Sequence, residues 1–148
     1  MFYRYQYEAQ YYPTLSRLPL DLRRKLDVTG VKLSLKVWLT FSFAERMVLC
    51  HLPCDANEEA QVFTNYLDFL SRKYTDAPIE KIEALDCALW ESSAVPQAVI
   101  DRSAALNRAV TLEQWRRWQS PQRYALYKTA VSKSQPEAFE QVLKQLSR

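Results

Sequence analysis

The sequence predicts an all-α fold, a single domain built as an irregular bundle of roughly six to seven helices, several of them short. One observation is that the 148 residues include a single glycine, whereas hairpins and barrels need glycine for turns with positive φ. The other is that apolar residues recur at spacings of three and four, the period of a helix face. We expect one domain over residues 1–148, with an extended arm at 1–18 and the helical bundle at 19–148.

The composition indicates a folded protein of the cytoplasm. Hydrophobic residues make up 48% and charged residues 25% of the chain, which is typical of globular rather than disordered proteins. No apolar run approaches the roughly 20 residues of a membrane-spanning helix, and the N-terminus lacks the order of a signal peptide. Three cysteines without a secretion signal indicate reduced thiols. We expect a cytoplasmic protein that does not bind membranes.

The first segment, FYRYQYEAQYY at residues 2–12, alternates tyrosines with polar residues. This alternation is typical of a strand or an extended arm. A lone strand is marginally stable, so we expect the arm to lie over the helices and bury its rings. Stacking of the rings on nucleic-acid bases is a second, less favoured interpretation.

The next segment, residues 17–46, contains the densest set of helix signals. Pro19 can open a helix because it lacks the N–H that a first-turn residue cannot use. Gly30 can end that helix with positive φ, and Ser34 can cap the next one. Ser42 and Glu45 have the spacing of a capping box, in which each side chain accepts a hydrogen bond from the other's backbone N–H. The pattern predicts three short helices in a tightly folded corner.

Further helices are expected along the rest of the chain. Asp55 and Glu58 have capping-box spacing and open a long helix that ends at Tyr74. Its predicted buried stripe consists of Val62, Phe63, Tyr66, Leu67, Leu70 and Tyr74. Residues 79–91 are expected to add a short helix after Pro78. Later helix starts are predicted at Pro96, at Thr111 with Gln114, at Ser120 before Pro121, and at Pro136. No internal repeat is evident in the sequence.

The net charge of +3 is unevenly distributed. Residues 17–36 carry six basic and two acidic side chains, residues 55–91 carry three basic and nine acidic ones, and residues 102–133 carry seven basic ones and one acidic one. One interpretation is that these segments are solvated helix faces. The other is a basic surface for an acidic protein partner or, less favoured, for nucleic acid.

Catalytic and metal-binding signals are weak. Cys50, His51, Cys54 and Cys87 are the soft ligands of the chain, but structural zinc usually needs paired ligands two to four residues apart, and here only the first pair is close. Ordinary buried thiols are the favoured interpretation, and a metal or iron-sulfur site is the less favoured one. A single glycine cannot build a phosphate loop or a dinucleotide fingerprint. The single histidine adjoins Cys50, and adjacent helical residues point about 100° apart. We therefore predict no catalytic residue, no metal, no cofactor and no enzymatic activity.

The residues of two segments carry a resemblance to a known family. LPLDLRRKLDVTGVKLSLKVW, followed by ER, and WRRWQSPQRYALYK resemble the two signature blocks of the nitrate reductase-associated proteins of cyanobacteria, and the resemblance covers nearly the whole chain. The first block corresponds to Arg23, Lys25, Leu26, Asp27, Gly30, Lys32, Leu33, Leu35 and Trp38. The second corresponds to Trp115, Gln122, Arg123, Tyr124, Ala125, Leu126 and Lys128. The chain departs from the pattern at Thr129, where a leucine is expected, and in the tail after Lys133, which lacks a histidine.

The resemblance implies a pathway rather than a mechanism. The family is associated with nitrate reductase and with molybdenum-cofactor biosynthesis, and is thought to be needed for assimilatory nitrate reductase activity without being the catalytic subunit. It implies no active site and no cofactor. Nitrate reductase is therefore the expected partner, with molybdenum-cofactor synthesis proteins as a second class of partner.

The leading hypothesis is a non-catalytic accessory protein that binds nitrate reductase through a basic helical face and supports its maturation or activity. The candidate partner-binding residues are Arg23, Lys25, Asp27, Lys32, Arg123 and Lys128. Residues assigned to the structural motif are Leu26, Gly30, Leu35, Trp38, Glu45, Arg46, Trp115 and Tyr124, with the two tryptophans expected in the core. The second hypothesis is a molybdenum-cofactor carrier or insertion factor, and the third is a nucleic-acid-binding regulator.

Overall fold

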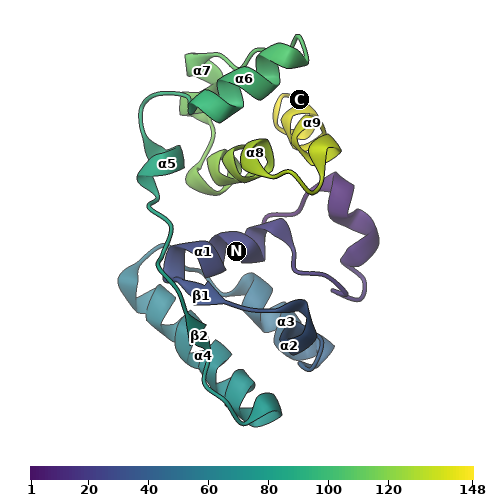
Figure 1. The fold of residues 1–148 in the computed structure, drawn as a ribbon, viewed down its shortest axis with the longest axis vertical. Helices are drawn as coiled ribbons and strands as arrows, with labels where there is room; N and C mark the ends of the chain where they lie inside the picture. The colour runs from purple at the N-terminus through teal and green to yellow at the C-terminus, as the bar shows by residue number, and fades with distance from the viewer. The chain divides into compact units, whose positions relative to one another are not determined.

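The computed structural model describes residues 1–148 and is mainly helical, which confirms the all-α prediction (Figure 1). Ten helices account for 61% of the residues, and the only sheet has two strands. The chain forms two compact units: unit 1 comprises Met1–Arg4 and Glu8–Leu85, and unit 2 comprises Tyr5–Tyr7 and Asp86–Arg148. The single domain over residues 1–148 stays a prediction. None of the helices is both long and apolar enough to cross a lipid bilayer.

The elements of the first part of the chain follow one another closely. In order they are η1 (Gln6–Tyr11), α1 (Leu20–Thr29), β1 (Val31–Lys32), α2 (Leu35–Trp38), α3 (Phe43–His51), α4 (Asn57–Thr75) and β2 (Glu80–Lys81). Strands β1 and β2 pair antiparallel, with Val31 opposite Lys81 and Lys32 opposite Glu80.

Residues 6–11 form a 3-10 helix, where the sequence predicted an extended arm. The side chain of Glu8 explains the difference, because it is buried and its carboxylate accepts hydrogen bonds from Tyr12 Oη at 2.9 Å and from the backbone N of Leu20 at 2.9 Å. A carboxylate four residues before its tyrosine partner holds the backbone in a turn, which the alternation of tyrosines does not reveal.

The predicted helix signals of the first corner are present. Gly30 ends α1 in the left-handed region at φ 71°. The hydroxyl of Ser34 accepts a hydrogen bond from the backbone N of Val37 at 3.1 Å. Ser42 and Glu45 form both hydrogen bonds of a capping box at the start of α3. Local side-chain chemistry therefore sets these boundaries.

The core of unit 1 lies between α1, α2, α3 and α4. Its buried residues are Leu15, Leu22, Leu26, Val31, Trp38, Phe41, Leu49, Cys50, Cys54, Phe63, Leu67 and Leu70. The buried stripe predicted on α4 is too wide, because Val62 is 55% exposed and Tyr74 is 37% exposed. The face of α4 that packs on the other helices is narrower than the apolar pattern suggests.

Two boundaries around α4 and β2 differ from the sequence prediction. The N-cap of α4 is Ala56, and the Glu59 carboxylate accepts hydrogen bonds from the backbone N of Asp55 and of Ala56. The predicted Asp55–Glu58 box is thus wrong by one residue. The short helix expected at residues 79–91 is wrong over its first part, where β2 pairs with β1, and correct only at α5 (Ala88–Glu91).

Unit 2 contains α5 and four further helices: α6 (Gln97–Ala105), α7 (Leu112–Arg117), α8 (Ser120–Val131) and α9 (Pro136–Leu146). Three of the predicted starts are correct, and the fourth is shifted because Gln119 rather than Ser120 is the N-cap of α8. Buried side chains of this unit include Trp90, Val99, Trp115, Tyr124, Leu126, Phe139, Val142 and Leu143.

Candidate functional site

Two of the predicted partner-binding residues of unit 1 are available at the surface. Arg23 is exposed, and its Nε donates to the carbonyl of Leu18 at 3.2 Å. Lys32 is exposed on β1, and no hydrogen bond or ion pair holds its ammonium group. Asp27 is half-buried, and its backbone carbonyl accepts a hydrogen bond from the N of Leu85 at 2.9 Å. Arg23 and Lys32 are therefore the cations of this set that unit 1 presents to solvent.

Lys25 lies inside unit 1, with no exposed surface. Its Nζ donates to the carbonyl of Cys50 at 2.5 Å and to that of Leu49 at 3.4 Å. These carbonyls belong to the last turn of α3, where the helix dipole favours a cation. Burial lowers the pKa of Lys25, and the nearby Asp21 carboxylate opposes that shift. The position of Lys25 leaves no surface for a partner, and its charge stabilises the end of α3.

Arg24 is buried as well. Its Nε donates to the Asp21 carboxylate at 2.8 Å, and Asp21 in turn accepts a hydrogen bond from the backbone N of Tyr3 at 3.0 Å. Of the three consecutive cations on α1, only Arg23 faces water. A basic run on a helix cannot all point outward, because successive side chains are rotated by about 100°.

In unit 2, Arg123 is half-buried and holds the end of α7. Its Nε donates to the carbonyl of Trp115 at 2.9 Å, its Nη2 donates to the carbonyl of Arg116 at 3.2 Å, and its guanidinium lies 5.6 Å from the Trp115 ring centre. We call this arrangement of one tryptophan and one arginine a clasp. Lys128, the other predicted cation of unit 2, is half-buried on α8. Arg123 thus has a structural task in addition to any role at a surface.

A second clasp is present in unit 1. Arg46 Nε donates to the carbonyl of Trp38 at 3.1 Å, and Nη2 donates to the carbonyl of Leu39 at 2.9 Å. The guanidinium lies 6.0 Å from the Trp38 ring centre. Both tryptophans are fully buried, in agreement with the core position expected for them. Among the other residues of the predicted structural motif, Leu26, Gly30 and Tyr124 are buried, whereas Leu35 is 45% exposed.

Glu45 connects the start of α3 to the end of α4. Its carboxylate accepts hydrogen bonds from the Ser42 backbone, from Tyr74 Oη at 2.7 Å and from Lys73 Nζ at 3.1 Å. Desolvation raises its pKa, but these hydrogen bonds outweigh it and lower the pKa to about 2. Glu45 is therefore ionised at neutral pH and is occupied by structural contacts.

Other exposed cations were not singled out from the sequence. They include Lys36, Arg108, Arg116, Arg117 and Lys133, and none of these five forms a side-chain hydrogen bond or an ion pair. The signal that could have found two of them is the WRRW sequence of α7. Once Trp115 points into the core, the two residues that follow it must point away.

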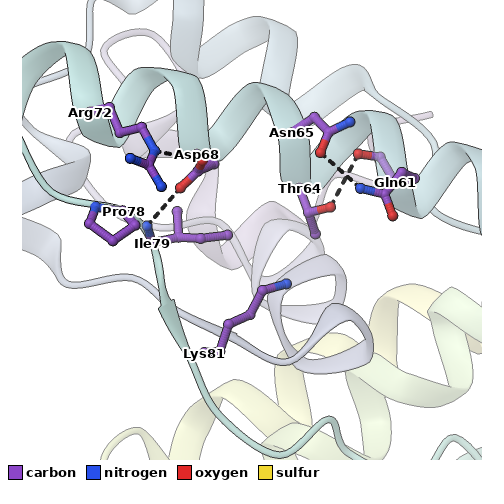
Figure 2. A pocket seen from close by; sticks show the side chains of 8 residues that line it. All are labelled: Gln61, Thr64, Asn65, Asp68, Arg72, Pro78, Ile79 and Lys81. Carbon is purple, nitrogen blue, oxygen red and sulfur yellow. Dashed lines mark hydrogen bonds and ion pairs between the residues drawn. The ribbon is translucent and has the colours of Figure 1, made fainter.

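Unit 1 also contains a polar groove between α4 and the segment before β2, with a volume of about 310 Å³ (Figure 2). Its lining consists of Gln61, Thr64, Asn65, Asp68, Arg72, Pro78, Ile79 and Lys81. Figure 2 shows Lys81 extending from the strand toward α4. The Asp68 carboxylate accepts from Arg72 Nε at 2.9 Å and from the backbone N of Ile79 at 3.0 Å. None of the predicted partner residues lines this groove, whose charged side chains are Asp68, Arg72 and Lys81.

The cysteines and the histidine do not gather around a common point. No group of three or more His, Cys, Asp or Glu side chains is arranged to hold a metal ion. Burial raises the pKa of the Cys50 thiol to about 12 and that of the Cys54 thiol to about 11, while Cys87 is exposed. The two buried thiols therefore stay protonated at neutral pH and behave as apolar core residues.

Comparison with known protein families supplies the identification. Residues 4–146 match the family described as conserved nitrate reductase-associated protein. The chain belongs to this family. This confirms the family resemblance drawn from the two blocks, and the cyanobacterial type stays a prediction. Searches of curated proteins and of solved structures found no match. Within this nitrate reductase-associated family, the description implies an association with nitrate reductase but no reaction and no binding surface.

Proposed function

We propose that this chain is a non-catalytic accessory protein of nitrate assimilation, located in the cytoplasm, that binds nitrate reductase through exposed basic side chains and supports its maturation or activity. Family membership supports the choice of partner. The observation that carries the mode of binding is the set of exposed cations without partners in the fold, which includes Lys32, Arg116 and Arg117.

Unpartnered cations matter because the fold does not need their charge. An exposed ion pair within a protein contributes about 0–1 kcal/mol, so leaving these groups unpaired costs the fold little. Complementary charge on a partner accelerates association and fixes its orientation. A complex held in this way should weaken as salt is added, because exposed charges are screened over about 10 Å at 0.1 M salt.

The test is a pull-down of nitrate reductase by the purified protein at low and at moderate salt. The variant Arg23→Glu/Lys32→Glu/Arg116→Glu/Arg117→Glu reverses exposed cations of both units. The matched control is Lys25→Met, which removes a cation that has no exposed surface. We expect the wild type and the control to retain the enzyme at low salt and the four-residue variant to lose it, with all three folded by circular dichroism. Failure of the wild type to bind at low salt would contradict the proposal.

The alternative function, a molybdenum-cofactor carrier, would use the polar groove beside α4. The observation in its favour is that the groove has hydrogen-bond donors on both sides, the Asn65 amide on α4 and the Lys81 ammonium group on β2 (Figure 2). Pterin fluorescence retained by the purified protein, and lost in Lys81→Ala, would support this function over the accessory one.

A further inference from the structure

The helices of the two units begin at matching intervals. In unit 1, α1, α2 and α3 begin at Leu20, Leu35 and Phe43, and in unit 2, α6, α7 and α8 begin at Gln97, Leu112 and Ser120. Each start in unit 2 lies 77 residues after its counterpart, the same interval that separates Trp38 from Trp115. The caps shift together with the helices, as shown by the pairs Pro19 and Pro96, Ser34 and Thr111, and Ser42 and Gln119.

The two clasps also share the hydrogen bonds around the tryptophan, although Arg46 adds a third one, from Nη1 to the carbonyl of Thr14 at 3.2 Å. In each unit, the arginine eight residues after the tryptophan donates through Nε to the tryptophan's own carbonyl and through Nη2 to the next carbonyl. Each indole Nε1 donates to the carbonyl 23 residues earlier, which belongs to Leu15 for Trp38 and to Ser92 for Trp115. The aromatic ring three residues after each tryptophan makes an edge contact with the indole. The ring centres are 6.3 Å apart for Trp38 and Phe41 and 6.4 Å apart for Trp115 and Trp118.

The turn after the first helix of each unit is equivalent too. Gly30 and Asn107, again 77 residues apart, both adopt positive φ, at 71° and 55°. The hydroxyl oxygens of Ser34 and Thr111 each accept a backbone hydrogen bond at 3.1 Å from the residue three positions later. The same local geometry is built in both units by residues that differ in identity but not in role.

In both units a cation neutralises the end of a neighbouring helix: it lies on α1 and acts on α3 in unit 1, and it lies on α6 and acts on α8 in unit 2. Lys25 donates to carbonyls in the last turn of α3. Arg102, 77 residues later, donates to the carbonyl of Ala130 at the end of α8 and to that of Pro136. Carbonyls at the end of a helix lack intrahelical partners, so a cation from a neighbouring helix supplies the missing donor.

The fourth helix follows with a small shift. The buried residues Phe63 and Leu67 of α4 correspond to Phe139 and Leu143 of α9, which lie 76 residues later. Across residues 19–52 and 96–129 the identical pairs are Pro19 and Pro96, Leu35 and Leu112, Trp38 and Trp115, Arg46 and Arg123, and Leu49 and Leu126.

We propose that the two units are copies of one four-helix module, and that their differences place the surface that binds an acidic protein segment on α7 of the second copy.

The placement on α7 follows from comparing exposed positions in the two copies. Directly after the tryptophan, the first copy has Leu39 and Thr40 and the second has Arg116 and Arg117, and all four side chains are exposed. Because the first copy folds with leucine and threonine, the module does not require arginine at these positions. The second copy thus carries two guanidinium groups, without partners in the protein, that serve no shared structural purpose.

The charge balance agrees with this placement. Unit 1 has eleven basic and eleven acidic side chains and is neutral, whereas unit 2 has nine basic and six acidic ones and a net charge of +3. Leu112, one turn before Arg116 on the same face of α7, is 41% exposed and adds apolar contact area. Arginine pairs with carboxylates through two parallel hydrogen bonds. The occupant is therefore an acidic peptide segment, which under the proposed function belongs to nitrate reductase.

The test replaces two residues of the second copy with their counterparts from the first copy. Arg116→Leu/Arg117→Thr gives α7 the residues that the first copy already accommodates, so the variant should fold. Binding is measured against nitrate reductase and separately against poly-L-glutamate. We expect the affinity of the exchanged variant for both to fall about tenfold or more, while Arg23→Glu/Lys32→Glu, which alters only the first copy, retains most of it.

The two ligands separate the possible failures. A folded exchange variant that binds poly-L-glutamate as tightly as the wild type would overturn the surface on α7. If the wild type ignores nitrate reductase but binds poly-L-glutamate through Arg116 and Arg117, the surface stands and the proposed function fails.

The duplication itself is tested by hydrogen exchange on the full chain. Arg46→Lys and Arg123→Lys keep the charge but cannot reproduce the two-pronged clasp. Each should accelerate amide exchange of its own short helix, α2 or α7, by about tenfold, while Arg17→Lys, an exposed arginine over the Tyr11 ring, should change neither helix. An effect confined to one of the two clasps would overturn their equivalence.

Discussion

Units 1 and 2 have the same order of helices, but some equivalent groups are more deeply buried in unit 1. At the end of the third helix, unit 1 uses a fully buried lysine, whereas unit 2 uses Arg102, which is half-buried and also lies 5.6 Å from the Phe139 ring centre. After the first helix, unit 1 adds a strand pair that covers Gly30, and unit 2 has no strand. The two units therefore share the role of a side chain, such as a cation that donates to helix-end carbonyls, even where the residue that fills the role differs.

The largest expected effect is the loss of stability when the tryptophan of either clasp is removed, and it tests whether the two clasps stabilise their units equally. Trp38→Ala and Trp115→Ala each remove a fully buried indole, and truncation of a buried tryptophan costs about 3–5 kcal/mol. We expect each variant to lose that much stability in urea unfolding, with hydrogen exchange placing the loss in the unit that carries the substitution. A Val131→Ala control, at an exposed position, should change stability little. Equal loss of protection in both units after one substitution would contradict two separate cores.

The next effect concerns pH and should be confined to unit 1. Pro19 provides no side-chain cap for α1, and the buried carboxylate of Glu8 accepts the hydrogen bond from Leu20 instead. Burial raises the pKa of Glu8 from 4.5 to about 7, although Tyr12, the Leu20 backbone and Arg23 oppose the shift and Asp21 adds to it. A raised carboxyl pKa in the folded state means that stability is fully present below pH 4.5 and is lost as pH rises toward 7.

The measurement is the free energy of unfolding between pH 5 and pH 8. We expect the wild type to lose up to roughly 3 kcal/mol across this range and Glu8→Gln to show a flatter profile. The Glu45 carboxylate does not interfere, because its pKa is lowered to about 2 and its contribution changes only at acidic pH. In unit 2, α6 also begins after a proline but has no side-chain cap, so its amide exchange should not follow this pH profile. A profile that Glu8→Gln leaves unchanged would contradict the assignment.

These differences show what the sequence could and could not predict. The starts of α2, α3 and α7 are encoded by residues within one turn, such as Ser34 and Thr111, and they were predicted correctly. The burial of Lys25 was not, because it depends on carbonyls 24 and 25 residues away. For the candidate site, Arg23 and Lys32 are exposed, and their role in partner binding stays a prediction.

The duplication could not be predicted from the sequence for a related reason. Its copies preserve hydrogen-bond roles while most residues differ, so that glycine matches asparagine and lysine matches arginine. That the fold does not require Arg116 and Arg117 of WRRW becomes clear only when they are compared with Leu39 and Thr40, the exposed residues at the same positions in the first copy. Shared hydrogen-bond roles can be recognised only when the positions of donors and acceptors are known, whereas shared residues can be recognised in the sequence.

A reciprocal exchange at the left-handed turn should have an intermediate effect. A Cβ at Gly30 would lie 2.6 Å from the carbonyl oxygen of Ile82, so Gly30→Asn should destabilise unit 1 by about 2 kcal/mol, through steric conflict and positive φ together. Asn107→Gly places no new atom and should change the stability of unit 2 by less than about 1 kcal/mol. Urea unfolding measures both. Equal tolerance in the two units would show that the strand pair of unit 1 does not restrict its turn.

The smallest effect is the one expected to be equal in the two units. The hydroxyl oxygens of Ser34 and Thr111 each accept one backbone hydrogen bond at 3.1 Å, and both residues are exposed. Ser34→Ala and Thr111→Ala should therefore each cost about 1 kcal/mol, the usual value of an N-cap, because neither site adds packing to the lost bond. Unfolding in urea with exchange at α2 and α7 checks the equality. A cost that differs by more than twofold would mean that one short helix depends on contacts beyond its cap, and the two copies would then have diverged in structure as well as in surface charge.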